Sequence, residues 1–376
     1  MSTNIQKTRV LFIGGEGRSG STVLERLLAV HPRTAAVGEA KYLFDRGVGQ
    51  RELCGCGQPV PECPLWSEVG KQLVGGWESR KGRELVRFFA KVNKPSRLPV
   101  TVMGRGAMVR RARDVLADLY PLIAELTGSS VIIDSSKHPS WAHLLTGTET
   151  VDLRVVHLVR HPSGVVQSWS RPLERPQAAS GTGEQMMPAH SSVEVVIRWN
   201  TFNRLFERLA RRSVPTILVR YEDYVEALED TVRACLGLVG LAYDSMPLAM
   251  TSGHGIAGNP SRFARDDTQI SVDDRWVTEL GGAKHALVSA ATRRRRRTYG
   301  YRFNRSLPTR PILRHAAGQL VVAEKRDPAN ESARLEPSKN RDAGDDADER
   351  AEGTEDGRGT VVGQVAREQD EPLDGR

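Results

Sequence analysis

Long apolar runs are missing from this sequence, and cysteine is scarce. The chain has 376 residues with four cysteines, and no run approaches the length needed to span a bilayer. The first residues, MSTNIQKTR, lead directly into a strand-like segment, without the apolar core and cleavage site of a secretory leader. These absences argue against a disulfide scaffold and an integral membrane protein, and they predict a cytoplasmic protein.

Three of the four cysteines lie close together in the sequence, at Cys54, Cys56 and Cys63, whereas Cys235 lies in a helical pattern. A Zn²⁺ site would need a fourth ligand, such as a histidine from elsewhere in the chain, and the C-x-C spacing differs from the usual C-x₂-C. We therefore favour a disulfide or free thiols in a compact loop over a metal site. All three possibilities stay open.

Charge is distributed unevenly along the chain. The formal net charge is +8, but from Ser306 onward 11 Lys and Arg face 16 Asp and Glu, which leaves +13 on the residues before it. A basic folded part suits a polyanionic cosubstrate, and equally a nucleic acid. We interpret the run Arg293–Arg297 as a solvated face near the end of the last helix, and we expect no nucleic-acid partner.

Composition also divides the chain. With 39% apolar and 27% charged residues it is typical of a globular protein. Residues 1–305 are predicted to form one α/β domain. Residues 306–376 are rich in Pro, Gly and acidic side chains and are predicted to form a largely disordered tail, because they bury too little apolar surface to offset the entropy of ordering.

The segment Arg9–Val30 predicts a strand, an anion-binding loop and a helix. An apolar, β-branched run meets a glycine-rich turn, and leucines at helical spacing follow. Glycines let backbone N–H groups approach an oxyanion, and the helix N-terminus adds partial positive charge. The lysine of a Walker loop is missing, although Asp134 after an apolar run imitates a Walker B strand. Arg18 supplies a cation inside the loop instead.

This loop resembles that of the sulfotransferases that use 3′-phosphoadenosine 5′-phosphosulfate (PAPS), which reads P-R-S-G-T/S-T. The matching residues are Gly17, Arg18, Ser19, Gly20, Ser21 and Thr22, with Gly17 in place of the usual proline. The resemblance implies that these residues bind the 5′-phosphosulfate. Without the resemblance, a glycine-rich turn that binds no ligand remains the alternative.

Two further motifs resemble the catalytic residues of that family. His31-Pro32 is followed by Gly38-Glu39, as in the H-P-x₅-G-E segment whose glutamate is the base in tyrosylprotein and bacterial carbohydrate sulfotransferases. Glu39 is therefore the expected base, although a turn glutamate or an ion pair explains it without chemistry. Lys137 follows a buried strand and matches the lysine that stabilises the leaving phosphate. His138 is a rival base and is equally explained as an ordinary residue at a helix start.

Later motifs resemble the nucleotide site. Arg160 and Ser168, eight residues apart, match the pair that binds the 3′-phosphate, and Tyr221 lies in a Y-E-D segment whose tyrosine packs near adenine. Arg262 and Arg265 lie in a cationic loop of the kind that closes over the nucleotide. Residues Arg171–Ser192 are rich in Pro, Gly, Ser and Gln and are predicted to gate the acceptor pocket.

Together these features predict a three-layer, P-loop-like α/β fold with a central parallel sheet flanked by helices. Strands are expected over Val10–Ile13, Ala35–Glu39, Ser130–Asp134, Leu153–Val159 and Thr216–Asp223. The expected function is sulfuryl transfer from PAPS to a hydroxyl of a sugar, glycolipid or secondary metabolite, with no metal required. An atypical P-loop kinase and a basic nucleic-acid binder are the alternatives, and the sequence does not indicate the oligomeric state.

Overall fold

The computed structural model describes residues 7–174, 186, 189–243, 253–263, 270–303, 313–315 and 320–321. The chain divides into two units, Met1–Glu324 and Lys325–Arg376, and all described residues lie in the first. Most of the expected C-terminal tail and most of the expected gate lie outside the described residues. The boundary at residue 305 therefore stays a prediction.

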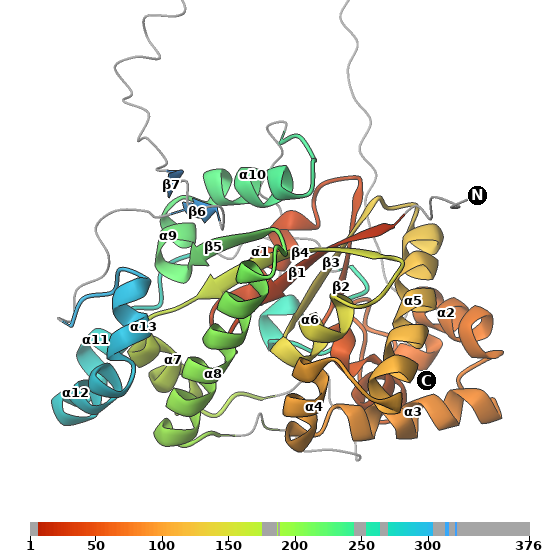
Figure 1. Ribbon diagram of the computed structural model, residues 1–376, viewed down its shortest axis with the longest axis horizontal. Helices are drawn as coiled ribbons and strands as arrows, with labels where there is room; N and C mark the ends of the chain where they lie inside the picture. The colour runs from red at the N-terminus through yellow and green to blue at the C-terminus, as the bar shows by residue number, and fades with distance from the viewer. Residues whose placement is uncertain are drawn as a thin grey trace, which may run out of the picture. The chain divides into compact units, whose positions relative to one another are not determined.

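A seven-stranded sheet runs through the first unit in the order β2-β3-β1-β4-β5-β6-β7 (Figure 1). The first five strands in this order pair in parallel, and two short strands continue the sheet in antiparallel pairing. The strands are β1 (Thr8–Gly14), β2 (Thr34–Gly38), β3 (Val131–Lys137), β4 (Val151–Val159), β5 (Thr216–Arg220), β6 (Leu313–His315) and β7 (Leu320–Val321). The predicted α/β fold with a central parallel sheet flanked by helices is confirmed.

Strand β1 explains why the fold has layers on both faces of the sheet. Its residues Val10 to Ile13 are apolar and fully buried, as expected for a central parallel strand. Because side chains alternate along a strand, Val10 and Phe12 enter one apolar core while Leu11 and Ile13 enter another. Each core needs its own layer of helices.

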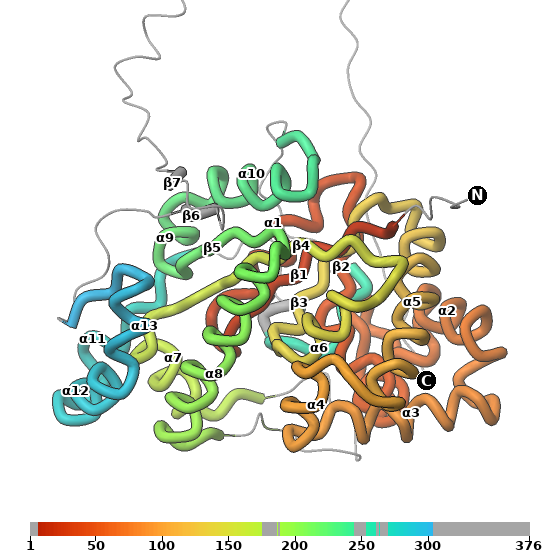
Figure 2. The backbone as a smooth tube through the Cα atoms, viewed as in Figure 1, coloured from red at the N-terminus to blue at the C-terminus, as the bar shows by residue number. Residues whose placement is uncertain are grey.

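Helices α1 (Ser21–Leu28) and α10 (Leu228–Leu238) belong to the core of Leu11 and Ile13. The opposite core is larger and takes side chains from α2, α3, α5, α6 and α8. Figure 2 shows α2 to α5 grouped beyond β2, and α11 to α13 at the other end of the sheet near β5. Those helices are α2 (Pro64–Val74), α3 (Arg80–Val92), α4 (Leu98–Met103), α5 (Ala107–Thr127), α6 (Pro139–Leu145), α7 (Pro162–Trp169), α8 (Ser192–Arg211), α9 (Tyr221–Glu226), α11 (Trp276–Glu279), α12 (Gly282–Ala291) and α13 (Arg293–Thr298).

Short helical turns follow β2 and enter the loops. They are the 3₁₀ turn η1 (Ala40–Tyr42), the π-helical η2 (Leu43–Val48), and the 3₁₀ turns η3 (Val60–Glu62), η4 (Pro95–Arg97) and η5 (Pro260–Phe263). Among the described residues, no helix is both long and apolar enough to cross a membrane.

The fifth expected strand is too long at its polar end. We expected it to reach Asp223, but β5 ends at Arg220 and α9 begins at Tyr221. Nε and Nη2 of Arg220 donate to the Asp223 carboxylate at 2.5 and 2.6 Å, and the helix dipole favours acidic residues in the first turn of α9. This local ion pair starts a helix where the sequence suggested continued extension.

The strand order brings three strand ends together. Strand β1 lies between β3 and β4, and all three run in parallel, so their carboxyl ends meet at one edge of the sheet. An irregularity after Phe12 pairs Gly14 with Lys137 of β3, and on the other side Gly14 pairs with His157 of β4. Ligands of open α/β sheets bind at such an edge, where the strand order reverses.

Candidate functional site

The glycine-rich loop leaves β1 in a conformation that only small residues allow. The amide of Gly15 donates to the carbonyl of Lys137 at 3.1 Å, and a Cβ on Gly15 would overlap the carbonyl oxygen of Leu158. Gly20 has φ of +87° and forms the N-cap of α1, where a Cβ would overlap the Tyr224 hydroxyl. The loop therefore packs tightly between β3 and β4 and delivers the N-terminus of α1 to the sheet edge.

A cavity of about 870 Å³ opens above this loop. Its walls include the predicted residues Gly17, Arg18, Gly20, Ser21, Thr22, Glu39, Lys137, Arg160, Ser168 and Tyr221. Ser19 does not line it: its side chain is buried, and its hydroxyl has no hydrogen-bond partner among the described residues. Among the residues that the structure describes, seven Lys and Arg but two carboxylates line the cavity, which favours a polyanionic ligand.

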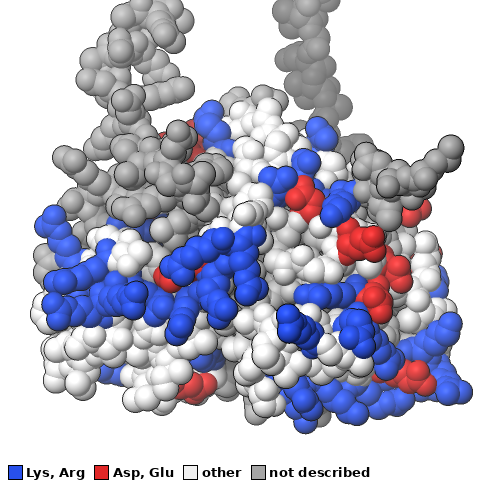
Figure 3. Space-filling view, viewed as in Figure 1, with Lys and Arg blue, Asp and Glu red and all other residues white. Residues whose placement is uncertain are grey.

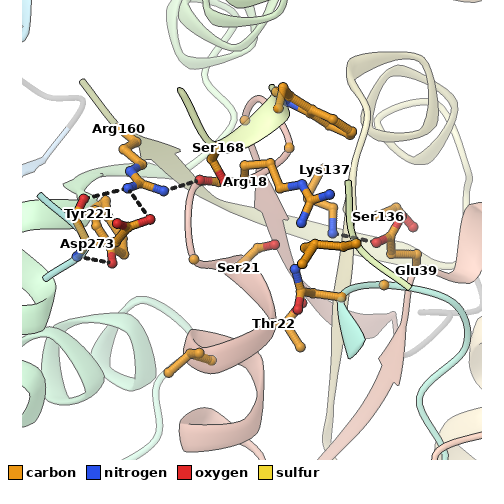
Figure 4. A pocket seen from close by; sticks show the side chains of 18 of the residues that line it. Arg18, Ser21, Thr22, Glu39, Ser136, Lys137, Arg160, Ser168, Tyr221 and Asp273 are labelled. Atoms are coloured by element: carbon orange, nitrogen blue, oxygen red, sulfur yellow. Dashed lines mark hydrogen bonds and ion pairs between the residues drawn. The ribbon is translucent and has the colours of Figure 1, made fainter. Parts of the chain in front are cut away.

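Figure 4 shows how the predicted residues divide between two ends of this cavity. Arg160 and Tyr221 lie at one end, Glu39 and Lys137 lie at the other, and Arg18 lies between them above α1. Residues from five separate segments of the chain thus meet around one space.

Arg18 is the cation at the centre of the loop. Its backbone φ is +66°, and its guanidinium lies 4.8 Å from the centre of the Trp169 ring. Burial, and to a lesser extent the positive charge of Arg160, lower the pKa of Arg18. Two cations that repel one another across a pocket are stabilised when an anion binds between them.

At the other end of the cavity, Lys137 forms an ion pair with Glu39. Their side chains are 16% and 10% exposed, so the pair is largely removed from water. Glu39 follows β2, and its amide donates to the carbonyl of Ile256 at 2.8 Å, which holds its backbone in place. A carboxylate held in this way beside an ammonium group is available to accept a proton from a ligand hydroxyl.

His138, the rival base, lines the same cavity but has a structural role. Its Nδ1 accepts a hydrogen bond from the amide of Ser140 at 3.2 Å and thereby caps α6. Burial, with smaller contributions from Lys41 and Arg198, holds the pKa of His138 well below its usual range. Nδ1 of His138 is therefore occupied in capping α6.

Arg160 at the far end of the cavity is tightly held. It donates to the carbonyl of Arg18 at 2.9 Å and to the carbonyl of Asp273 at 2.6 Å, and it forms an ion pair of 3.1 Å with the Asp273 carboxylate. Its guanidinium lies 4.4 Å from the centre of the Tyr221 ring. Burial raises the pKa of Asp273, but hydrogen bonds and charge from Arg275 and Arg160 outweigh it and hold that pKa well below the usual range.

The remaining nucleotide-site predictions have mixed outcomes. Tyr221 lines the cavity, and its hydroxyl accepts a hydrogen bond of 3.0 Å from the amide of Asp273. Ser168 lines the cavity from α7. The side chain of Arg262, in η5, and the whole of Arg265 lie outside the described residues, so their role stays a prediction.

The likeness of Asp134 to a Walker B aspartate is wrong at the level of the site. Asp134 is fully buried and does not line the cavity. Its carboxylate accepts hydrogen bonds from Tyr120, from Trp141 Nε1 at 3.1 Å and from the amide of Ser136 at 2.8 Å. Burial raises the pKa of Asp134 to about 6, although these donors partly offset the effect. The Asp134 carboxylate is therefore a buried hydrogen-bond acceptor that holds Tyr120, Trp141 and Ser136 at the end of β3.

Several site residues escaped the sequence analysis. Trp169 stacks under Arg18, Arg198 forms a 3.0 Å ion pair with the buried Glu16, and Asp273 holds Arg160. Trp169 follows Ser168 directly, so a neighbouring motif offered a signal for it. Arg198 carried none, because one arginine on a helix looks like solvated surface.

Arginines also gather outside the cavity. Figure 3 shows a band of Lys and Arg over α13 and α8. Among the arginines of α13, Arg296 is buried and donates to the carbonyl of Tyr301 at 2.9 Å, and Arg295 lies 3.5 Å from Glu207. Part of the run Arg293–Arg297 therefore makes structural contacts within the fold, so the interpretation as a solvated face does not hold for Arg295 and Arg296.

Comparison with known proteins identifies the fold. No protein-family model and no curated protein sequence matches the chain. Among solved structures, the sulfotransferase domain from the curacin biosynthetic pathway aligns with TM-score 0.50 and 19% identity, over 79% of this chain and 99% of that one. The sulfotransferase domain of the Synechococcus PCC 7002 olefin synthase aligns with TM-score 0.47 and 20% identity, over 80% and 97%. From the first alignment, the chain has the fold of a sulfotransferase domain.

Proposed function

We propose that this protein transfers a sulfuryl group from PAPS to the hydroxyl of an acceptor. One observation carries the proposal: a single cavity joins the glycine-rich loop to Arg160 at one end and to the Glu39–Lys137 pair at the other. The sequence motifs that resemble a phosphosulfate loop, a 3′-phosphate site and a catalytic pair are thus neighbours in space, in the order that one extended nucleotide requires.

PAPS carries anionic groups at its two ends, and the cavity offers a cationic site for each. The amides of Gly17–Thr22 and the N-terminus of α1 suit the 5′-phosphosulfate. Arg160 and Ser168 suit the 3′-phosphate, and the face of Tyr221 suits the adenine. Arg160 now pairs with Asp273, so binding the 3′-phosphate requires that phosphate to replace the carboxylate or to share the guanidinium with it.

The transfer itself follows from the opposite end of the cavity. Glu39 accepts the proton of the acceptor hydroxyl, and the oxygen attacks sulfur in line. The bond from sulfur to the bridging oxygen breaks, and 3′-phosphoadenosine 5′-phosphate (PAP) leaves. Arg18 and Lys137 stabilise the negative charge that develops on the sulfuryl and bridging oxygens, the role that Mg²⁺ has in kinases, so the proposed step needs no metal.

The acceptor end is lined by Tyr42, Arg46, Gln50 and Phe202. Arg46 lies 4.7 Å from the centre of the Tyr42 ring, and Gln50 adds an amide. An aromatic wall suits the C–H face of a sugar ring, and the polar groups beside it can hydrogen-bond the hydroxyls of a sugar or a glycosylated metabolite. We therefore place a small molecule or glycan, and not a nucleic acid, as the acceptor.

The kinase alternative is less well supported by the site. It needs a Walker lysine, which the loop lacks, and a carboxylate that holds Mg²⁺ beside the phosphates. Asp134 was the candidate for that carboxylate, and its oxygens are occupied beneath the sheet by Tyr120, Trp141 and Ser136.

The test is calorimetric titration of the full chain with PAP without added metal. Removal of Arg160 loses two or more charge-assisted hydrogen bonds, each worth about 1.5–3 kcal/mol, so Arg160→Ala should weaken binding at least about 100-fold. Arg154→Ala is the matched control, since Arg154 lies on β4, the strand that Arg160 directly follows, pairs with Asp152 and does not line the cavity. A chain that ignores PAP but binds ATP with Mg²⁺ would be a kinase.

A further inference from the structure

Away from the nucleotide cavity, four potential metal ligands converge. The ligand atoms of Cys54, Cys56, Cys63 and His254 all lie within 4.8 Å of one another. His254 Nδ1 is 3.2 Å from the sulfur of Cys63 and 3.9 Å from that of Cys54. Four ligands at about 2.1–2.3 Å from one tetrahedral Zn²⁺ are themselves roughly 3.4–3.8 Å apart. The observed spacing needs only small side-chain movements to match.

The local backbone is built to present the sulfurs. Leu53 and Pro59 form an antiparallel bridge, and within this hairpin the amide of Cys54 donates to Gln58 O at 2.8 Å. Cys63 is the N-cap of α2. The N-terminus of a helix stabilises a thiolate, the form that binds metal.

The fourth ligand comes from a distant part of the chain. His254 lies 191 residues beyond Cys63, and backbone bonds hold its segment against the cysteine hairpin. Trp66 Nε1 donates to the carbonyl of His254 at 2.8 Å, and the amide of Gly55 donates to the carbonyl of Gly255 at 2.9 Å. The sequence left a fourth ligand undetermined, and the fold supplies it.

We propose that Cys54, Cys56, Cys63 and His254 bind one structural Zn²⁺ ion. Three thiolates and an imidazole are a closed ligand set, which leaves no open position for catalysis. Binding releases the thiol protons to solvent, and the complex of three thiolates, one neutral imidazole and Zn²⁺ carries a net charge of −1. This departs from our expectation of a disulfide or free thiols, because a disulfide would use two sulfurs and leave the imidazole idle.

The proposed ion would also support the nucleotide cavity. Ile256 lies two residues after His254. Its carbonyl accepts a hydrogen bond from the amide of Glu39, and its own amide donates to the carbonyl of Val37. The segment that would bind zinc therefore also holds the end of β2, which is followed by Glu39. The same segment continues to Gly258 and Asn259, which line the cavity. Zinc would therefore tie the cysteine hairpin to the backbone of the proposed base.

The first test is the zinc content of the full chain, purified without a polyhistidine tag from zinc-supplemented medium and measured by plasma mass spectrometry. We expect about one Zn²⁺ per chain in the wild type and less than about a tenth of that in Cys63→Ser and His254→Ala. Cys235→Ala is the matched control, because it removes a buried thiol from α10 and should keep its zinc. Cobalt substitution should give the visible bands of tetrahedral thiolate coordination.

Two outcomes would overturn the proposal: a soluble wild-type chain without zinc, or a Cys54–Cys63 disulfide in its intact mass. If Cys63→Ser fails to fold, two other variants test the proposal. Cys56→Ser, at the exposed position, should lose zinc. His254→Cys, which replaces one zinc ligand by another, should retain it. Zinc content does not depend on PAP. A chain that holds zinc but ignores PAP would refute the proposed function and leave the metal site standing.

Discussion

Replacing Glu39 by Gln separates the proposed base from the nucleotide site. Glutamine keeps the length of the side chain and an oxygen that can accept from Lys137, and the backbone of residue 39 stays bonded to Ile256. The protein should therefore fold. What is lost is the ability to take a proton from the acceptor, because an amide oxygen is not a base at neutral pH.

General base catalysis contributes about 10²–10⁴-fold to rate, which corresponds to about 2.7–5.5 kcal/mol of the barrier. We expect kcat of Glu39→Gln to fall within that range. Its affinity for PAP should stay the same or rise, because a negative charge beside Lys137 has been removed from an anion site. A general loss of structure would lower both kcat and the affinity for PAP, so it cannot imitate this result.

The assay is the release of PAP from PAPS, with an acceptor found by screening hydroxylated compounds, alongside calorimetry with PAP. Glu68→Gln is the control, since it makes the same change in an exposed ion pair with Lys71 on α2. His138→Asn keeps a capping side chain at the start of α6 and tests the rival base. The reasoning fails if Glu39→Gln loses less than about tenfold in kcat, or if His138→Asn loses more than Glu39→Gln does.

Two further predictions concern stability. Burial lowers the pKa of His157 to about 4, so between pH 6.5 and 4 the unfolded chain binds a proton that the folded chain does not. The contribution of His157 to the free energy of unfolding is therefore fully present above pH 6.5 and is lost as the pH falls. At pH 5 the loss is about 2 kcal/mol. Burial also raises the pKa of Glu16 and Glu25 to about 7, and these two groups change the stability with pH in the opposite direction. The measurement is therefore the difference in urea-unfolding free energy between the wild type and His157→Gln as a function of pH. An equal pH slope in both proteins would contradict the prediction. Gly15→Ala should lower the free energy of unfolding by at least about 3 kcal/mol or prevent folding. The control is Gly128→Ala, which is also at positive φ but has nothing within 4 Å of the added Cβ, and it should lower that free energy by about 1 kcal/mol. Equal urea-unfolding midpoints for the two variants would refute the packing argument.

Much of the sheet was predictable because its strands are buried on both faces. Three central segments have continuous apolar runs, and the strands found there, β1, β3 and β4, extend beyond the predicted ones by at most three residues. The strand β5 begins at Thr216 as predicted but ends three residues earlier. The prediction of a strand over Tyr221–Asp223 was wrong because strand propensity does not include an ion pair between residues three apart in the sequence. The Arg220–Asp223 contact becomes decisive only when a helix brings residues three apart onto one face.

The candidate site was partly readable for a different reason. Gly17–Thr22, Glu39, Lys137 and Arg160 all stand at or just beyond predicted strand ends, and parallel strands place those ends at one edge. Tyr221 lies just beyond the observed end of β5. Asp273 and Arg198 were missed because they reach the cavity from outside the sheet. Neither follows a strand, so no local pattern marked them.

The sequence by itself determined which segments contain the five parallel strands, where the anion loop lies and which charged side chains follow it, because these depend on local pattern and on burial. Only the tertiary structure decided what each side chain meets: Asp134 is drawn into the core, Asp273 holds Arg160, and His254 joins three cysteines across 191 residues. Such pairings depend on strand order and loop packing, which bring distant residues within a few ångströms of one another and leave no trace in local spacing.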